Sequence, residues 1–129
     1  MIIRLDPQSA APPYAQLQEQ IGTMIRSGVL EEGSRLPAIR HLANDLGVAV
    51  NTVGRAYREL ELDGLVAPHG RHGTVVRSPA ASSAPERRAG VASAAAAYAI
   101  EARHRGASLD QALAAVRTAF TQLDQQEVS

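Results

Sequence analysis

Residues 46–66, LGVAVNTVGRAYRELELDGLV, place a very short turn between two helical patterns, and this turn constrains the fold more than any other feature of the chain. The first pattern ends at Gly47, and the second begins near Ala49 to Asn51. So short a turn forces two helices to cross steeply and projects the second one outward, which is the geometry of a DNA-recognition helix. A glycine turn also joins ordinary packed helices in many small proteins. The pattern alone therefore leaves both a recognition helix and a core-packing helix open.

Apolar residues at helical spacing predict three helices around this turn. Pro12 and Pro13 precede the first helix, because proline favours the first position of a helix, and Ser27-Gly28 ends it. Leu36-Pro37 leads into the second helix. The residues expected to face inward are Tyr14, Leu17, Ile21, Met24 and Ile25, then Ile39, Leu42, Ala43 and Leu46, then Val53, Ala56, Tyr57 and Leu60.

Two β-like runs follow the third helix. Leu65-Val66 and Thr74–Val76 flank His69–Gly73, which is a hairpin signal. Ile2–Leu5 could add a short strand at the N-terminus. The order helix, helix, short turn, helix, hairpin predicts a fold that is mainly α with a small β-wing, namely a winged helix-turn-helix domain over residues 1–77.

From residue 78 onward the sequence pattern changes. Residues 78–90, SPAASSAPERRAG, have no periodic apolar pattern and predict a linker. Residues 91–126 predict two helices, of which the first carries Tyr98, and Ser108 with Gln111 has the spacing of a capping box before the second. The second helix has an apolar seam made of Leu109, Leu113, Val116, Phe120 and Leu123. Two such helices cannot enclose a core alone, so the seam and Tyr98 predict a dimerisation region that forms a homodimer.

Composition excludes several functional classes. The 129-residue chain has no Cys, which rules out disulfides and thiolate zinc sites. No stretch approaches about 18 apolar residues, and the N-terminus lacks a signal-peptide pattern, so a cytoplasmic protein without a membrane partner is expected. We find no nucleophile beside a base, no phosphate loop and no metal-ligand spacing; His69 and His72 lack a nearby carboxylate or Cys. An enzyme, a cofactor and a metal site are therefore not expected.

The positions of the charged residues, rather than their sum, bear on nucleic-acid binding. The formal net charge is zero, so the chain as a whole is not steered toward nucleic acid. Residues 35–77, however, contain six Arg against four acids. Glu59, Glu61 and Asp63 all fall in the last turns of the third helix, which leaves Arg at its beginning and middle. This local segregation favours a DNA-binding surface over a solvated face with mixed ion pairs.

The segment LPAIRHLANDLGVAVNTVGRAYRELELDGLV resembles the DNA-binding domain of the GntR family of bacterial transcription regulators. The family pattern has the form LPS-x-R-x-LA-x-x-LGVS-x-x-TV-x-x-A-x-x-x-L-x-x-x-GL, and the resemblance extends over residues 12–76. The NTV-x-x-AY core and the short helical tail are similar to the YtrA-like subfamily. Members of that subfamily have a compact helical dimerisation region in place of a large effector domain.

The resemblance implies contacts with double-stranded DNA from the second helix, the third helix and the wing. Arg40 corresponds to the family's Arg in the second helix and is expected at a base edge or a phosphate, while its alternative is a surface salt bridge with Asp45. Asn51 begins the third helix, where it either pairs with adenine or caps the helix. The other expected DNA-binding residues are Thr52, Arg55 and Arg58 in the third helix and Arg71, His72, Gly73 and Thr74 in the wing. Arg58 is expected to contact phosphate or remain solvated.

Three departures from the family pattern affect which DNA sequence is read. Ala38 and Ala49 stand where the family has Ser, so two helix caps and two hydroxyl contacts are missing. Val50 stands where Arg is frequent. In the wing, the order Gly70-Arg71 replaces Arg-Gly. None of these changes threatens the predicted fold.

The resemblance favours a sequence-specific, homodimeric transcription regulator, a repressor that binds a palindromic operator through the third helix and the wing. The neutral charge and the missing Ser and Arg side chains support the alternative of a winged-helix protein-interaction module that does not read DNA. GntR regulators commonly respond to a small molecule. The sequence names neither an effector nor an operator.

Overall fold

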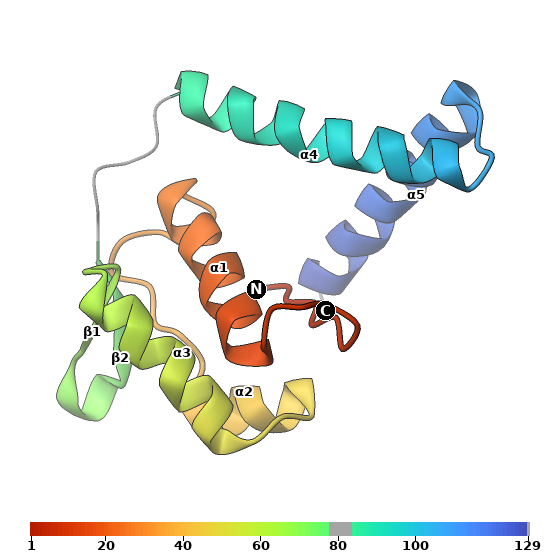
Figure 1. Ribbon diagram of the computed structural model, residues 1–129. Helices are drawn as coiled ribbons and strands as arrows, with labels where there is room; N and C mark the ends of the chain where they lie inside the picture. Colours follow the sequence, from red (N-terminus) through yellow and green to blue (C-terminus); the bar gives the residue numbers. More distant parts are fainter. Residues whose placement is uncertain (78–83, 129) are drawn as a thin grey trace. The chain divides into compact units, whose positions relative to one another are not determined.

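The computed structural model describes residues 1–77 and 84–128, and the chain divides into two compact units, Ile3–Ser82 and Ser83–Ser129 with Met1–Ile2. The first unit contains three helices, α1 (Pro13–Arg26), α2 (Ile39–Leu46) and α3 (Val50–Leu62). A two-stranded hairpin follows, with β1 (Val66–Pro68), the 3₁₀ turn η1 (Gly70–His72) and β2 (Thr74–Val76) (Figure 1). The predicted winged helix-turn-helix is confirmed.

The core of this unit joins all of its elements. Leu17 and Ile21 from α1 are fully buried, as are Val53 and Leu60 from α3. Tyr57 is also buried, and its hydroxyl donates a hydrogen bond to the Pro37 carbonyl oxygen at 2.7 Å, which ties α3 to the segment before α2. Burial of the apolar face of α3, rather than helix capping, stabilises this helix, because its N-cap residue Ala49 offers no side-chain hydrogen bond.

The turn between α2 and α3 is set by one glycine. Gly47 has a φ of 69°, in the left-handed region that suits glycine. The amide of Val48 then donates to the Ala43 carbonyl at 3.0 Å, which satisfies a carbonyl at the end of α2. Helix α3 begins at Val50, within the range expected from the sequence.

The hairpin is held by a third extended segment that the sequence did not predict. Within the hairpin, Val66 pairs with Val76 and Pro68 with Thr74, in antiparallel register. Arg35 forms a β-bridge with Val75, and the Leu36 amide donates to the Thr74 carbonyl at 2.8 Å. The wing is therefore fixed to the chain that enters α2.

The predicted strand at Ile2–Leu5 is wrong. No strand is present there, because the side chain of Gln20 on α1 takes up the backbone of Arg4, accepting from its amide at 3.0 Å and donating to its carbonyl at 2.7 Å. Gln16 binds the backbone of Asp6 in the same way, at 2.7 and 2.9 Å. The N-terminal arm thus runs along α1 without a strand partner.

The second unit consists of two long helices, α4 (Ala84–His104) and α5 (Leu109–Val128). The linker prediction is wrong for residues 84–90, which belong to α4, and its remainder, residues 78–83, lies outside the described residues. The predicted capping box is present: the Ser108 hydroxyl accepts from the Gln111 amide at 3.2 Å, and the Gln111 side chain accepts from the Ser108 amide at 2.8 Å. Among the described residues, no helix is long and apolar enough to span a membrane.

Much of the apolar surface of this two-helix unit is exposed. Tyr98 joins the helices by donating to the Ala112 carbonyl at 2.9 Å, yet 38% of Tyr98 remains exposed. Within the predicted seam, Leu109, Leu113 and Phe120 are 73%, 46% and 63% exposed, while Val116 and Leu123 are half-buried. The seam is thus largely uncovered within one chain.

Candidate nucleic-acid interface

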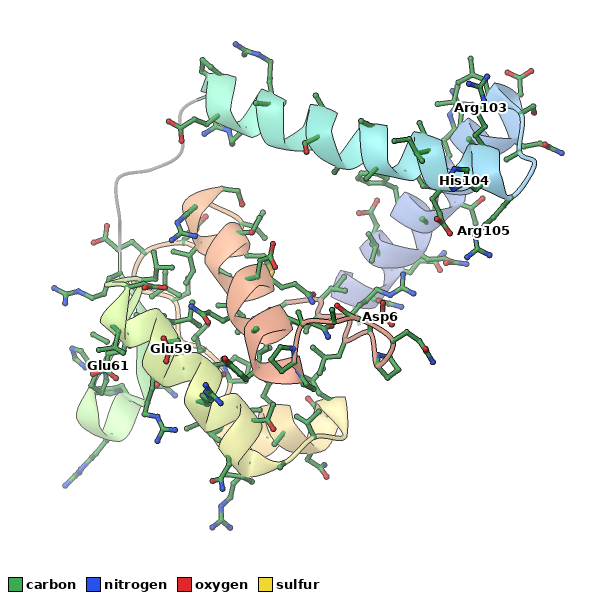
Figure 2. All side chains as sticks on the ribbon, in the orientation of Figure 1. Asp6, Glu59, Glu61, Arg103, His104 and Arg105 are labelled. Atoms are coloured by element: carbon green, nitrogen blue, oxygen red, sulfur yellow. The ribbon has the colours of Figure 1, made fainter. Side chains whose placement is uncertain are left out.

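One face of α3 carries a polar, exposed row that we call the α3 stripe, made of Asn51, Arg55 and Arg58. Their spacing of four and three residues puts them on the side of the helix opposite the buried Val53 and Leu60. Glu59 and Glu61 lie in the C-terminal half of α3 (Figure 2). The N-terminal and middle turns therefore present cationic and amide groups to solvent.

Two predicted residues at the start of α3 take different positions. Asn51 does not cap the helix, since the N-cap is Ala49 and has no side-chain hydrogen bond. The Asn51 amide group is thus left exposed. Thr52 is half-buried, with its backbone amide donating to the Ala49 carbonyl at 3.0 Å, so it flanks the α3 stripe instead of forming part of it.

Arg40 is exposed in the first turn of α2. Its alternative role, a salt bridge with Asp45, is not observed, because Asp45 pairs with His41 at 3.2 Å. Within residues 1–77, no Arg forms a salt bridge with an acid. The arginines of the winged unit are consequently not neutralised by its acids, although the whole chain has a net charge of zero.

Arg40 and the wing line the same surface hollow. Its volume is about 430 Å³, and its walls come from the start of α2, from α3 through Tyr57, and from the wing. The basic and wing residues that line it are Arg35, Arg40, Arg71, His72, Gly73 and Thr74. The structure thus brings the predicted contacts of α2 and of the wing together, while the α3 stripe is a separate row on the same unit.

Arg35 is a functional candidate that sequence reasoning missed. Its Nη2 lies 3.1 Å from Nδ1 of His72. Guanidinium nitrogen only donates, so Nδ1 accepts and the other ring nitrogen of a neutral His72 carries the hydrogen. Arg35 therefore orients a wing residue. The only signal in the sequence was an Arg directly before Leu36-Pro37, and nothing local links it to residue 72.

Tyr57 lies beneath this hollow, and burial raises its pKa from 10.0 to about 12. A raised pKa means that the folded state holds the phenolic proton more tightly than the unfolded state does. The stability that the neutral Tyr57 contributes is therefore complete below pH 10 and is lost as pH rises toward 12. We expect the free energy of unfolding to fall by about 2 kcal/mol over this interval. Urea unfolding at stepped pH measures this fall. Tyr57→Phe should show a smaller decline, and equal slopes for both proteins would contradict the assignment.

The exposed row of Asn51, Arg55 and Arg58 on the third helix, together with a basic hollow shared by the second helix and the wing, defines a winged helix-turn-helix protein of the DNA-binding class. The family model for bacterial regulatory proteins of the gntR family matches residues 13–76. Together with the relatives below, this match shows that the chain belongs to the GntR family, as the sequence resemblance predicted.

The relatives differ in how much of the chain they cover. The "HTH-type transcriptional regulator Rv1152" of Mycobacterium tuberculosis is 47% identical over 74 residues, 57% of this chain and 61% of that protein. The "HTH-type transcriptional repressor YtrA" of Bacillus subtilis is 33% identical over 85 residues, 66% of this chain and 65% of that protein. The chain thus spans just under two thirds of these curated relatives.

Two solved structures are informative. YtrA from Sulfolobus acidocaldarius, described as a GntR-family transcription factor, has a TM-score of 0.57 and 35% identity, covering 74% of this chain and 99% of that one. The DNA-binding domain of AraR in complex with operator ORX1 has a TM-score of 0.51 and 29% identity, covering 57% of this chain and 92% of that one. The chain is therefore similar to a DNA-binding domain whose structure was solved in complex with an operator.

Proposed function

We propose that this protein is a cytoplasmic, sequence-specific transcription regulator, and a repressor rather than an enzyme. In this proposal the winged unit, up to Arg77, binds double-stranded DNA, and the two-helix unit forms a homodimer. Two-fold symmetry of the dimer then requires a palindromic operator with one winged unit per half-site. Membership of the GntR family and the similarity to an operator-bound domain support the proposal.

The observation that carries it is the set of unpaired cations on the winged unit. Asn51, Arg55 and Arg58 follow one exposed row on α3, which we place in the major groove. Arg40, at the rim of the basic hollow, would read a base edge or hold a phosphate. Arg71, His72, Gly73 and Thr74, with Thr52 at the flank of α3, complete the proposed DNA-binding set.

The wing is suited to a close approach to DNA. Gly73 has a φ of 73°, a conformation in which a side chain would be strained, so the turn that presents Arg71 and His72 depends on glycine at this position. Arg71 and His72 are exposed on this turn. We place them at the minor groove or its flanking phosphates.

Arg40→Ala should weaken binding to the selected operator by about 5- to 150-fold, since one bidentate Arg contact contributes about 1–3 kcal/mol. The operator is first obtained by selecting bound duplexes from a random library, and affinity is then measured by mobility shift at several salt concentrations. Arg26→Ala is the matched control, because Arg26 is an exposed arginine in the last turn of α1, outside the hollow and the α3 stripe. A wild-type protein with no preference for any duplex would overturn the proposed function.

A second candidate function is a protein-interaction module that keeps the winged fold. The favouring observation is that α3 exposes apolar side chains at both ends, with Val50 47% and Leu62 79% exposed. A partner protein that binds at α3, together with no duplex binding, would support this candidate.

A further inference from the structure

Arg55 differs from the other members of the α3 stripe because it is stacked on an aromatic ring. The central carbon of its guanidinium lies 3.7 Å from the centroid of the Tyr14 ring. Tyr14 is half-buried in the first turns of α1 and packs against the core, while Arg55 is exposed. In the described part of the chain, Arg55 has no hydrogen bond and no ion pair.

Stacking of this kind restricts an arginine without using its hydrogen-bonding capacity. The ring occupies one face of the planar guanidinium, whereas the five N–H donors lie in the plane and remain available. A free arginine side chain samples many rotamers and loses that freedom when it binds a fixed acceptor. Tyr14 has already limited this freedom for Arg55, because its own ring is held by the core.

We propose that Tyr14 is a positioning residue for DNA recognition, which holds the guanidinium of Arg55 so that its N–H edge meets an acceptor on the duplex. This inference rests on the proposed function, because it requires that the α3 stripe lie against DNA. It assigns a role to α1, an element outside the helix-turn-helix and the wing. Arg58, one turn further along the same stripe, has no ring stacked on it within the described residues and supplies an internal comparison.

The test is a double-mutant cycle on the selected operator, using the full chain. Tyr14→Leu should weaken binding about two- to fivefold, the range of an exposed cation–π contact. Tyr14→Phe should bind within about twofold of wild type, because the ring face is retained. In the Arg55→Ala background, Tyr14→Leu should cause no further loss, whereas in the Arg58→Ala background it should keep its full effect.

A second readout reports on the stacking itself. The Nε–Hε resonance of Arg55, measured by NMR in the free protein, should carry a ring-current shift that is absent in Tyr14→Leu and present in Tyr14→Phe. Thermal unfolding of each variant identifies any loss of folded protein. A Tyr14→Leu effect that persists in the Arg55→Ala background would show that Tyr14 acts only through packing, and tighter binding by Tyr14→Leu would show that the ring withholds Arg55 from DNA.

These outcomes separate the two proposals. If wild-type protein selects no operator, the proposed function fails and the positioning role fails with it. If wild-type protein binds an operator but the cycle shows no coupling between Tyr14 and Arg55, only the positioning role is overturned. Coupling confined to Arg55, together with the ring-current shift, would establish it.

Discussion

Replacing Leu60 with Ala should lower the free energy of unfolding by about 2–5 kcal/mol, the range for truncating a fully buried leucine. Leu60 is 0% exposed and lies on the face of α3 that packs against α1, where it approaches the helix at Gly22. The substitution removes apolar contacts and leaves a cavity that α1 and α3 can close only in part. Urea unfolding followed by circular dichroism measures the loss.

Leu62→Ala is the matched control for this prediction. Leu62 lies two residues further along the same helix and is 79% exposed, so the same substitution should change the free energy of unfolding by less than about 0.5 kcal/mol. Equal effects at the two positions would mean that α3 does not pack through the face described here.

Phe120→Glu should convert the proposed homodimer to a monomer and weaken operator binding by on the order of 100-fold or more, because the second winged unit would no longer bind at the effective concentration set by the first. Phe120 is 63% exposed within one chain, so a charged side chain is tolerated there by the isolated helix. In the proposed dimer, the same charge would be buried in an apolar seam without a partner. Analytical ultracentrifugation gives the mass, and mobility shift gives the affinity.

Thr118→Glu controls for the charge itself. Thr118 is an exposed residue two positions before Phe120, which puts it on the opposite side of α5 from the seam. This variant should remain dimeric and bind DNA nearly as wild type does. A Phe120→Glu protein that stays dimeric would show that the seam is not the dimer interface.

The elements set by local chemistry could be predicted from the sequence. Gly47 marks the end of α2 because few other residues adopt its left-handed conformation, and Ser108 with Gln111 marks the start of α5 through hydrogen bonds over three residues. The sequence does not predict the early start of α4, because Ser, Pro and Ala together are typical of a linker. Alanine is also the strongest helix former, and proline is acceptable in a first turn, which is where Pro85 lies.

Features that depend on distant residues could not be predicted in this way. The Arg35–His72 contact joins residues 37 positions apart, and nothing in either neighbourhood specifies it. Ile2–Leu5 has the composition of a strand, but the glutamines of α1 bind the backbone of this arm instead. For the candidate site, the family resemblance supplied the candidate residues, whereas the absence of a salt bridge between Arg40 and Asp45 became clear only from the contact of Asp45 with His41.

The pairing of residues 34–36 with β2 has a consequence for the spacing of contacted bases in the operator. The Leu36 amide donates to the Thr74 carbonyl and the Val76 amide donates to the Ser34 carbonyl, each at 2.8 Å, so the wing is tied to the segment that enters α2. In the proposed complex, the bases contacted by the wing and those contacted by α3 would then lie at a fixed spacing from one another. We expect an operator with one base pair inserted between them to bind more weakly, because the hydrogen-bonded wing would have to give up contacts to follow the longer spacing.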